Sequence, residues 1–253
     1  MEVSFMSNAK QIDQLLEGFL KRGLPGCGLK VVQYGNTLYE GYFGVTDIDT
    51  KTPVTKDTLF RQASMSKIPL YTVMMMLYER GKFLLTDPIG DYLPEWKTST
   101  RYDRHPNGYV DIVPTSRPIN IRDVMSMKCG LPYCNSAAPT HDLVMTGMQE
   151  CMQPLWKKGS YTLKEHLSAM SKAPLACDPG THWIYGFSSE LAAGIIEAVC
   201  DKPVNDVFKE MLFDPLGMKD TAAIFPDEQT KNRLVTLYAN CLLYTSPSPR
   251  DRG

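Results

Sequence analysis

The sequence contains no run of eighteen apolar residues, so no segment predicts a helix that spans a membrane. Residues 1–16 lack a basic segment followed by an apolar one, so they do not predict a secretory signal. The charges nearly balance, with 27 Lys and Arg against 28 Asp and Glu, which predicts no general attraction to nucleic acid or to an acidic membrane. Together these absences favour a cytoplasmic globular protein.

Several common catalytic and ligand-binding motifs are also absent. The seven cysteines form no Cys-x-x-Cys pair and the four histidines form no His-Glu-x-x-His pattern, so the sequence predicts no metal site. A Gly-x-Ser-x-Gly elbow and a phosphate-binding loop are missing as well, which argues against an α/β-hydrolase and a nucleotide-binding protein. The cysteines are expected to be reduced, buried thiols, and no cofactor is predicted.

The composition that is present fits a globular protein. Apolar residues make up 43% and charged residues 22% of 253 positions, enough for one large domain or two small ones. Apolar spacing predicts a helix over 8–22. Two β-prone runs, 29–33 and 37–43, predict a hairpin that turns at 35–36.

The middle of the chain is expected to be mostly helical. From residue 64 to Gly81, apolar residues cover nearly the whole circumference, which predicts a fully buried helix. Residues 97–118 are polar and contain proline and glycine, so a loop is expected, and 132–160 give mixed signals. Capping residues and apolar spacing predict four further helices, over 121–127, 162–171, 191–200 and 205–213. A lone hairpin is too small a sheet, so strands after residue 240 are expected to complete it.

The last thirteen residues, 241–253, differ in kind from the rest. The eleven residues from Cys241 to Asp251 match the in-frame translation of a transposase-type sequencing-library adapter at every position. They are therefore expected to be artificial, and residues 1–240 to form an incomplete catalytic domain. The alternative is a natural disordered tail that is rich in proline and serine.

Ser64 and Lys67 form a Ser-x-x-Lys motif. Residues three apart on a helix share one face, with Cβ atoms about 5–6 Å apart, so the lysine amine can reach the serine hydroxyl. Serine becomes a good nucleophile only when its proton is removed, and burial can lower the pKa of a lysine enough to help. The motif alone is a weak signal, because Ser7 and Lys10 repeat it and Ser64 could equally cap a helix. A lysine within a buried helix favours the catalytic interpretation.

Five segments follow one another along the chain: Phe60–Lys67, Gly81–Glu95, Ile119–Leu131, Pro179–Tyr185 and Leu212–Met218. Their residues and their order resemble the serine β-lactamase-like, penicillin-recognising family across roughly residues 10–240. The resemblance implies a mixed α and β fold of the β-lactamase/transpeptidase type. Such a fold has a mainly antiparallel sheet flanked by helices, together with a helical region. It implies neither a metal nor an organic cofactor.

The resemblance implies that Tyr185 is the third catalytic residue, a proton relay beside Ser64 and Lys67. Without the resemblance, Tyr185 would be interpreted as a core tyrosine. Family members that hydrolyse β-lactams usually have Tyr-x-Asn here, whereas this chain has Phe187 in place of the asparagine. Phenylalanine cannot form amide hydrogen bonds with a substrate, which argues against β-lactamase and peptidase activity. The family's Lys/His-x-Gly strand, which would supply one oxyanion-hole N–H, has no match before residue 240.

The expected function is a serine hydrolase that forms an acyl-enzyme on a small ester or amide, most specifically a carboxylesterase. A β-lactamase or a D-Ala-D-Ala-type peptidase is the alternative. A catalytically silent homologue that binds or assembles is an alternative of another class. The chain as given is expected to be inactive, because an oxyanion hole that lacks one donor typically loses about 10²–10³ in rate.

Deleting residues 241–253 should leave the melting temperature unchanged, because these residues are expected to have no packing role. Thermal unfolding of the shortened and the complete chain, followed by circular dichroism, measures this. A clear loss of stability would contradict the adapter interpretation. So would the same codons at an independently sequenced genomic locus.

Overall fold

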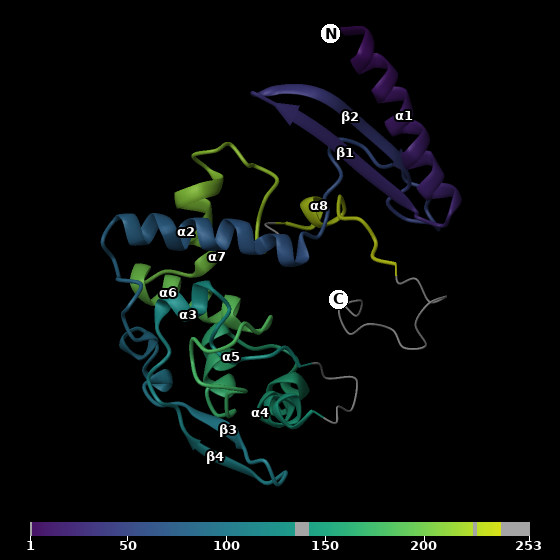
Figure 1. Cartoon of the computed structure of the whole chain (residues 1–253). Coiled ribbons are helices and arrows are strands. Elements are labelled where there is room, and N and C mark those ends of the chain that lie inside the picture. The colour runs from purple at the N-terminus through teal and green to yellow at the C-terminus, as the bar shows by residue number, and fades with distance from the viewer. Residues whose placement is uncertain (1, 135–141, 225–226, 239–253) are drawn as a thin grey trace. The chain divides into compact units, whose positions relative to one another are not determined.

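The computed structural model of the chain describes residues 2–134, 142–224 and 227–238 (Figure 1). The predicted adapter at 241–253 lies outside these residues. The described part combines helices with two separate two-stranded antiparallel sheets, so the expected mixed α and β class is confirmed. It divides into two compact units, one formed by residues 64–223 and the other by the segments on either side.

The first unit contains a long helix and a hairpin. Its elements are α1 (Glu2–Lys21), β1 (Gly26–Gln33), β2 (Asn36–Gly44) and, late in the chain, α8 (Glu228–Lys231). The hairpin turns at Tyr34 and Gly35, one residue earlier than the sequence predicted, and both residues have positive φ, 49° and 78°. Two positive φ values match the twist of a two-residue hairpin turn, which explains the shift.

The second unit, residues 64–223, is mainly helical. Its α-helices are α2 (Lys67–Glu79), α3 (Ile121–Met125), α4 (Leu143–Lys158), α5 (Leu163–Met170), α6 (Ser188–Cys200) and α7 (Val204–Phe208). Short turns of tighter or wider helix complete it: η1 (Ala63–Ser66), η2 (Ile89–Asp91), η3 (Pro94–Trp96) and η4 (Lys209–Phe213). A second hairpin joins β3 (Thr100–Arg104) to β4 (Val110–Pro114).

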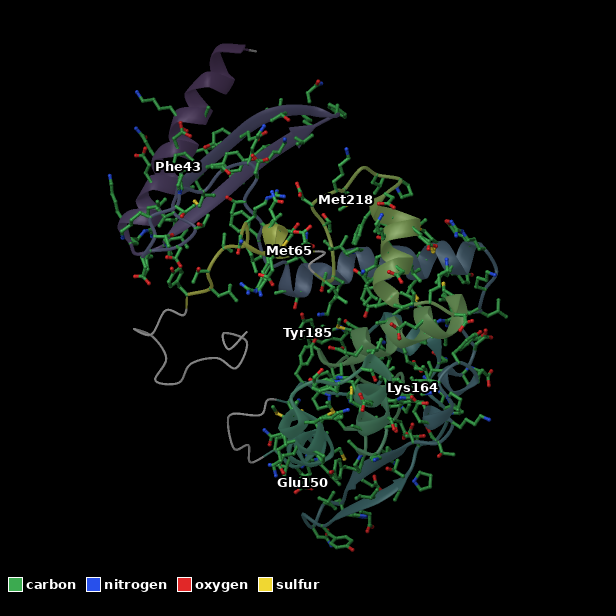
Figure 2. All side chains as sticks on the ribbon, turned by 180° about the vertical axis from the view of Figure 1, so that it is seen from behind. Phe43, Met65, Glu150, Lys164, Tyr185 and Met218 are labelled. Carbon is green, nitrogen blue, oxygen red and sulfur yellow. The ribbon has the colours of Figure 1, made fainter. Side chains whose placement is uncertain are left out.

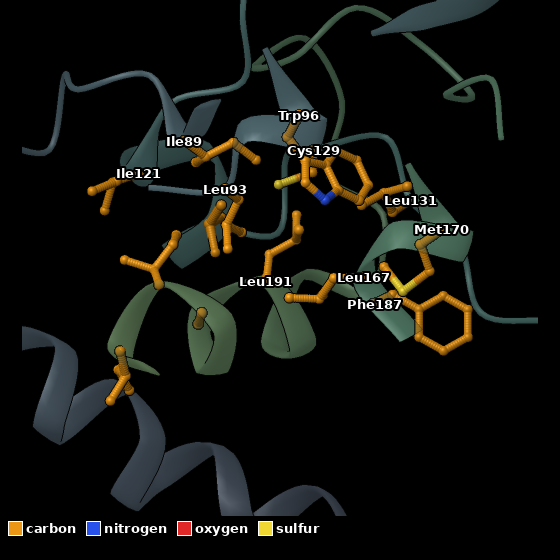
Figure 3. Packing of buried hydrophobic residues seen from close by; sticks show 14 of the residues in the cluster. Ile89, Leu93, Trp96, Ile121, Cys129, Leu131, Leu167, Met170, Phe187 and Leu191 are labelled. Carbon is orange, nitrogen blue, oxygen red and sulfur yellow. The ribbon is translucent and has the colours of Figure 1, made fainter. Parts of the chain in front are cut away.

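Helix α6 lies at the centre of the second unit's core. It packs against α2, α3, α5 and α7. Leu191, Ile195 and Ile196 on α6 are fully buried, in a cluster that also includes Trp96 and Met170 (Figure 3). Burial of each such side chain contributes about 1.5–3 kcal/mol to the free energy of folding. Burial against α6 therefore stabilises the packing of the neighbouring helices.

The prediction that the helix after residue 64 is buried on all sides was wrong. Val73 and Met74 of α2 are inaccessible to solvent, but Ile68 is 68% and Met75 40% exposed. The second unit therefore covers only one side of α2.

The loop predicted over 97–118 was also wrong, since β3 and β4 form a hairpin there. Gly108, with φ 85°, supplies the turn. Tyr102 of β3 is buried, and its backbone N–H donates to Leu175 while Leu175 donates to Thr100. These tertiary bonds, which the polar local sequence does not reveal, hold the hairpin in place.

Helix α4 lies within residues 132–160, where the sequence predicted no clear secondary structure. Asp142 caps it by accepting from the N–H groups of Val144 and Met145, and Gly159 ends it with φ 83°. Pro154 lies inside the helix and removes one hydrogen bond. Burial of an apolar face that includes Met148 offsets this cost.

The last predicted helix begins earlier than expected. Its N-cap is Pro203 rather than Asn205, and the helix continues into the π-helical turn η4. The side chain of Asn205 instead accepts a hydrogen bond from the backbone of Ala223.

One buried carboxylate ties the loop before α3 to the helix itself. Asp123 is 4% exposed and receives two hydrogen bonds from the guanidinium of Arg117, at 2.6 and 2.9 Å. It also accepts from the backbone of Asn120, whose own side chain caps Asp123 in return, both at 2.9 Å. Both oxygens of this carboxylate thus accept hydrogen bonds from groups close in sequence.

Replacing Asp123 with alanine should lower the free energy of unfolding by about 2–3 kcal/mol, because charged hydrogen bonds and a helix cap are lost together. Urea denaturation measures the change. The matched control is Asp111→Ala, which removes an exposed carboxylate beside His105 and should change stability by about 0.5 kcal/mol or less. Equal effects of the two variants would contradict this role of Asp123.

Candidate active site

Ser64 and Lys67 lie at the junction of η1 and α2. Ser64 is in the turn η1 and is exposed, and Lys67 is the first residue of α2 and is half-buried. The Nζ of Lys67 lies 3.4 Å from the Oγ of Ser64. The spacing argument thus placed the amine correctly, although Ser64 precedes the α-helix rather than lying within it.

Tyr185 completes the predicted group. Its Oη lies 2.6 Å from the Oγ of Ser64, within hydrogen-bond distance. Figure 2 shows Tyr185 close to the start of α2, where Met65 is labelled. The structure therefore brings together all three residues that the sequence singled out.

Backbone hydrogen bonds hold the segment that carries Tyr185. The N–H of Gly180 donates to Lys128 at 2.8 Å, and that of Ile184 donates to Met127 at 2.9 Å. The N–H of Phe187 donates to Leu131 at 3.2 Å. Residues 180–187 thus run beside residues 127–132. These backbone hydrogen bonds fix the position of the chain at Tyr185.

Glycine is required beside the tyrosine. Gly186 lies so close to the carbonyl of Leu131 that a Cβ at this position would collide with the oxygen. Gly180, with φ 83°, adopts a backbone conformation that L side chains rarely take, and a Cβ there would collide with the guanidinium of Arg117. Gly186 therefore allows the two segments to approach, and Gly180 leaves room for Arg117.

Tyr133 is a site residue that the sequence analysis missed. Its Oη lies 3.2 Å from the Nζ of Lys67, and its ring meets the ring of Tyr185 edge-on at 5.4 Å. No short motif contains Tyr133, and only its position two residues after Leu131 could have suggested a role. The tertiary structure brings it to Lys67 because residues 127–132 run beside the segment of Tyr185.

The pKa of Lys67 differs from the expectation. Burial lowers it, as the sequence argument supposed, but hydrogen bonds with Tyr133 and Tyr185 raise it more strongly. The net result is a raised pKa, so the expectation of a lysine neutralised by burial was wrong. Lys67 is an ammonium near neutral pH, stabilised by two phenol oxygens.

Phe187 fills the position where asparagine was noted as usual in β-lactam hydrolases. It is 8% exposed, and its ring meets Tyr133 edge-on at 4.9 Å. It therefore packs behind Tyr133 and offers no hydrogen bond to a substrate.

A buried carboxylate lies at the start of α6, just beyond Phe187. The Oε2 of Glu190 has no hydrogen-bond partner among the described residues, and burial raises the pKa of Glu190, while the charge of Lys67 acts in the opposite direction. The hydroxyl oxygens of Ser188 and Ser189 are also buried, with Cys129 beside Ser188 and Tyr71 beside Ser189. Buried polar atoms of this kind are commonly satisfied by ordered water.

The described residues include no cluster of three or more His, Cys, Asp or Glu side chains that could hold a metal ion. In the same part of the chain, no helix is both long enough and apolar enough to cross a membrane.

A family profile described as Beta-lactamase matches residues 12–241. The chain belongs to the beta-lactamase family. The resemblance drawn from five sequence segments is thereby confirmed, and this family includes serine hydrolases and peptidases.

Among curated members of the beta-lactamase family, "Esterase EstB" from Burkholderia gladioli is 25% identical over 217 residues, covering 85% of this chain and 51% of that protein. "D-alanyl-D-alanine-carboxypeptidase/endopeptidase AmpH" from Escherichia coli (strain K12) is 24% identical over 218 residues, covering 86% of this chain and 50% of AmpH. The chain thus spans about half the length of these relatives.

Solved structures show the same fold. "EstCE1, a hydrolase with promiscuous acyltransferase activity" superimposes with a TM-score of 0.76 at 23% identity, covering 93% of this chain and 57% of EstCE1. This likeness establishes the β-lactamase/transpeptidase fold for the beta-lactamase-family chain.

Replacing Glu190 with glutamine should stabilise the protein more at pH 7 than at pH 4. Burial raises the folded-state pKa of Glu190 above its ordinary value of 4.5. Its contribution to stability is therefore complete below that value and is lost as the pH rises through the folded-state pKa. Urea denaturation at both pH values measures this, with Glu150→Gln on the exposed side of α4 as control. An equal effect of Glu190→Gln at both pH values would contradict it.

Proposed function

We propose that the chain carries the nucleophile half of a serine hydrolase that forms an acyl-enzyme, most specifically a carboxylesterase. The observation that carries the proposal is the convergence on the Oγ of Ser64, with the Oη of Tyr185 at 2.6 Å and the Nζ of Lys67 at 3.4 Å. An exposed serine with two proton-handling groups in direct reach has the arrangement of an activated nucleophile.

The proposed reaction begins with Lys67 as an ammonium beside the phenolate form of Tyr185. Tyr185 accepts the proton of Ser64 as the Oγ attacks the ester carbonyl carbon. When the tetrahedral intermediate collapses, the bond to the alcohol oxygen breaks, and Tyr185 returns the proton to that oxygen. Water then attacks the acyl-enzyme while Tyr185 takes its proton, and the proton passes to the Oγ of Ser64 as the acid leaves.

Phe187 supports an ester rather than an amide as the substrate. A site that recognises an amide gains from side-chain hydrogen bonds to it, and Phe187 provides none. The name of EstB is consistent with ester hydrolysis, whereas that of AmpH keeps D-Ala-D-Ala-type peptidase activity as the second candidate. A catalytically silent binding protein is the third, disfavoured by the intact site.

Ser64→Ala should abolish covalent labelling by a fluorophosphonate, because the variant lacks the activated hydroxyl oxygen to which the phosphorus would bond. Intact-protein mass spectrometry detects the adduct on the complete 253-residue chain. The matched control is Ser160→Ala, which changes an exposed serine between α4 and α5 and should label like the parent chain. An adduct on the Ser64→Ala variant would mean that another residue is the nucleophile.

The same protein distinguishes the candidate activities. Because the missing oxyanion-hole donor is expected to slow the reaction by about 10²–10³, the test looks for a single acylation after long incubation and not for turnover. A short-chain p-nitrophenyl ester should then acylate the parent chain, giving a mass increase equal to the acyl group, whereas a cephalosporin should not. A stable cephalosporin adduct would favour the D-Ala-D-Ala-type peptidase, and consumption of the cephalosporin without a lasting adduct would favour the β-lactamase. Failure of all three reagents would favour the silent homologue.

A further inference from the structure

Lys67 has two phenols beside it, and the proposed reaction uses only one. The Nζ lies 3.2 Å from the Oη of Tyr133 and 3.4 Å from the Oγ of Ser64. It also lies 5.0 Å from the ring centre of Tyr185 and 5.8 Å from that of Tyr133. An ammonium group has three protons to donate. Ser64 and Tyr133 accept at these distances, and Tyr185 also hydrogen-bonds with Lys67.

The ring of Tyr133 is held from two sides. It meets Phe187 edge-on at 4.9 Å and Tyr185 edge-on at 5.4 Å. The neighbouring Pro132 pairs with Gly186 in an antiparallel bridge between the two backbone segments. The phenol oxygen of Tyr133 is therefore fixed in place before any substrate binds.

We propose that Tyr133 is a positioning residue for Lys67. Its Oη accepts one ammonium proton and keeps the Nζ between Ser64 and Tyr185. The role rests on the proposed function, because a positioned Lys67 matters only if Ser64 is the nucleophile. Phe187 contributes by supporting the ring of Tyr133, which gives this apolar residue a purpose in the site.

The other titratable groups around Lys67 come from α2 and α6. They are Tyr71, in which burial raises the pKa of the phenol, and Glu190, whose buried carboxyl group has been described. The charge of Lys67 opposes both shifts. No ion pair joins Lys67 to a carboxylate among the described residues, so its hydrogen bonds to phenols are the direct contacts that favour the ammonium form.

The test is Tyr133→Phe, which removes only the hydroxyl group and keeps the edge-on ring contacts. Loss of this hydrogen bond should lower the pKa of Lys67, so Lys67 should become reactive at lower pH. Trace acetylation of the complete chain across a pH series, quantified by peptide mass spectrometry, measures this directly. The readout requires no turnover and therefore does not depend on the proposed function.

Fluorophosphonate labelling is the second measurement. A hydrogen bond to a charged group is worth about 1.5–3 kcal/mol, so labelling of Tyr133→Phe should be slower by roughly 10–100-fold. The alkaline limb of its pH profile should move to lower pH. Tyr161→Phe is the control, because Tyr161 stacks on His166 and lies away from Lys67 in the site as described; it should change neither measurement. Near-ultraviolet circular dichroism checks that each variant folds.

An acetylation profile of Lys67 that is the same in Tyr133→Phe and the parent would overturn the proposal. A shifted profile with unchanged labelling would overturn its catalytic part, because Lys67 would then be held by Tyr133 without effect on Ser64. If the parent chain itself is not labelled, the proposed function fails, and the acetylation profile still decides whether Tyr133 controls Lys67.

Discussion

The pairing of residues 127–132 with residues 180–187 is the interaction on which the candidate site depends. Three backbone hydrogen bonds join the segments, and Gly186 permits the close approach. One segment delivers Tyr133 and the other delivers Tyr185, so a single backbone arrangement places both phenols beside Lys67. A change that separated the segments would remove both phenols at once.

The paired segments are connected to the helical core around α6. Phe187 ends the second segment and leads directly into α6, in which Leu191, Ile195 and Ile196 are fully buried. The serine and lysine lie at the start of α2, which packs against α6. Ser64, Lys67 and Tyr185, the proposed nucleophile and proton-handling groups, are therefore held by elements that share one core, which limits their relative movement.

The electrostatics of the site follow from the same geometry. Burial alone would disfavour the charge on Lys67, but the phenol oxygens of Tyr133 and Tyr185 favour it more strongly, and the pKa is raised. Tyr133 reaches Lys67 only through the segment pairing. The sequence places Lys67 in an apolar helix, but it does not reveal that the phenol oxygens of Tyr133 and Tyr185 lie beside the amine.

The sequence by itself determined the family and most helices, and it predicted the three site residues that the structure brings together. These signals are local: a three-residue spacing fixes the face shared by Ser64 and Lys67, and capping residues such as Thr162 mark helix starts. Only the tertiary structure decided the β3–β4 hairpin, the exposed side of α2 and the place of Tyr133. Each of these depends on contacts between segments far apart in the chain, as between Tyr102 and Leu175, and such contacts leave no periodic pattern in the residues that make them.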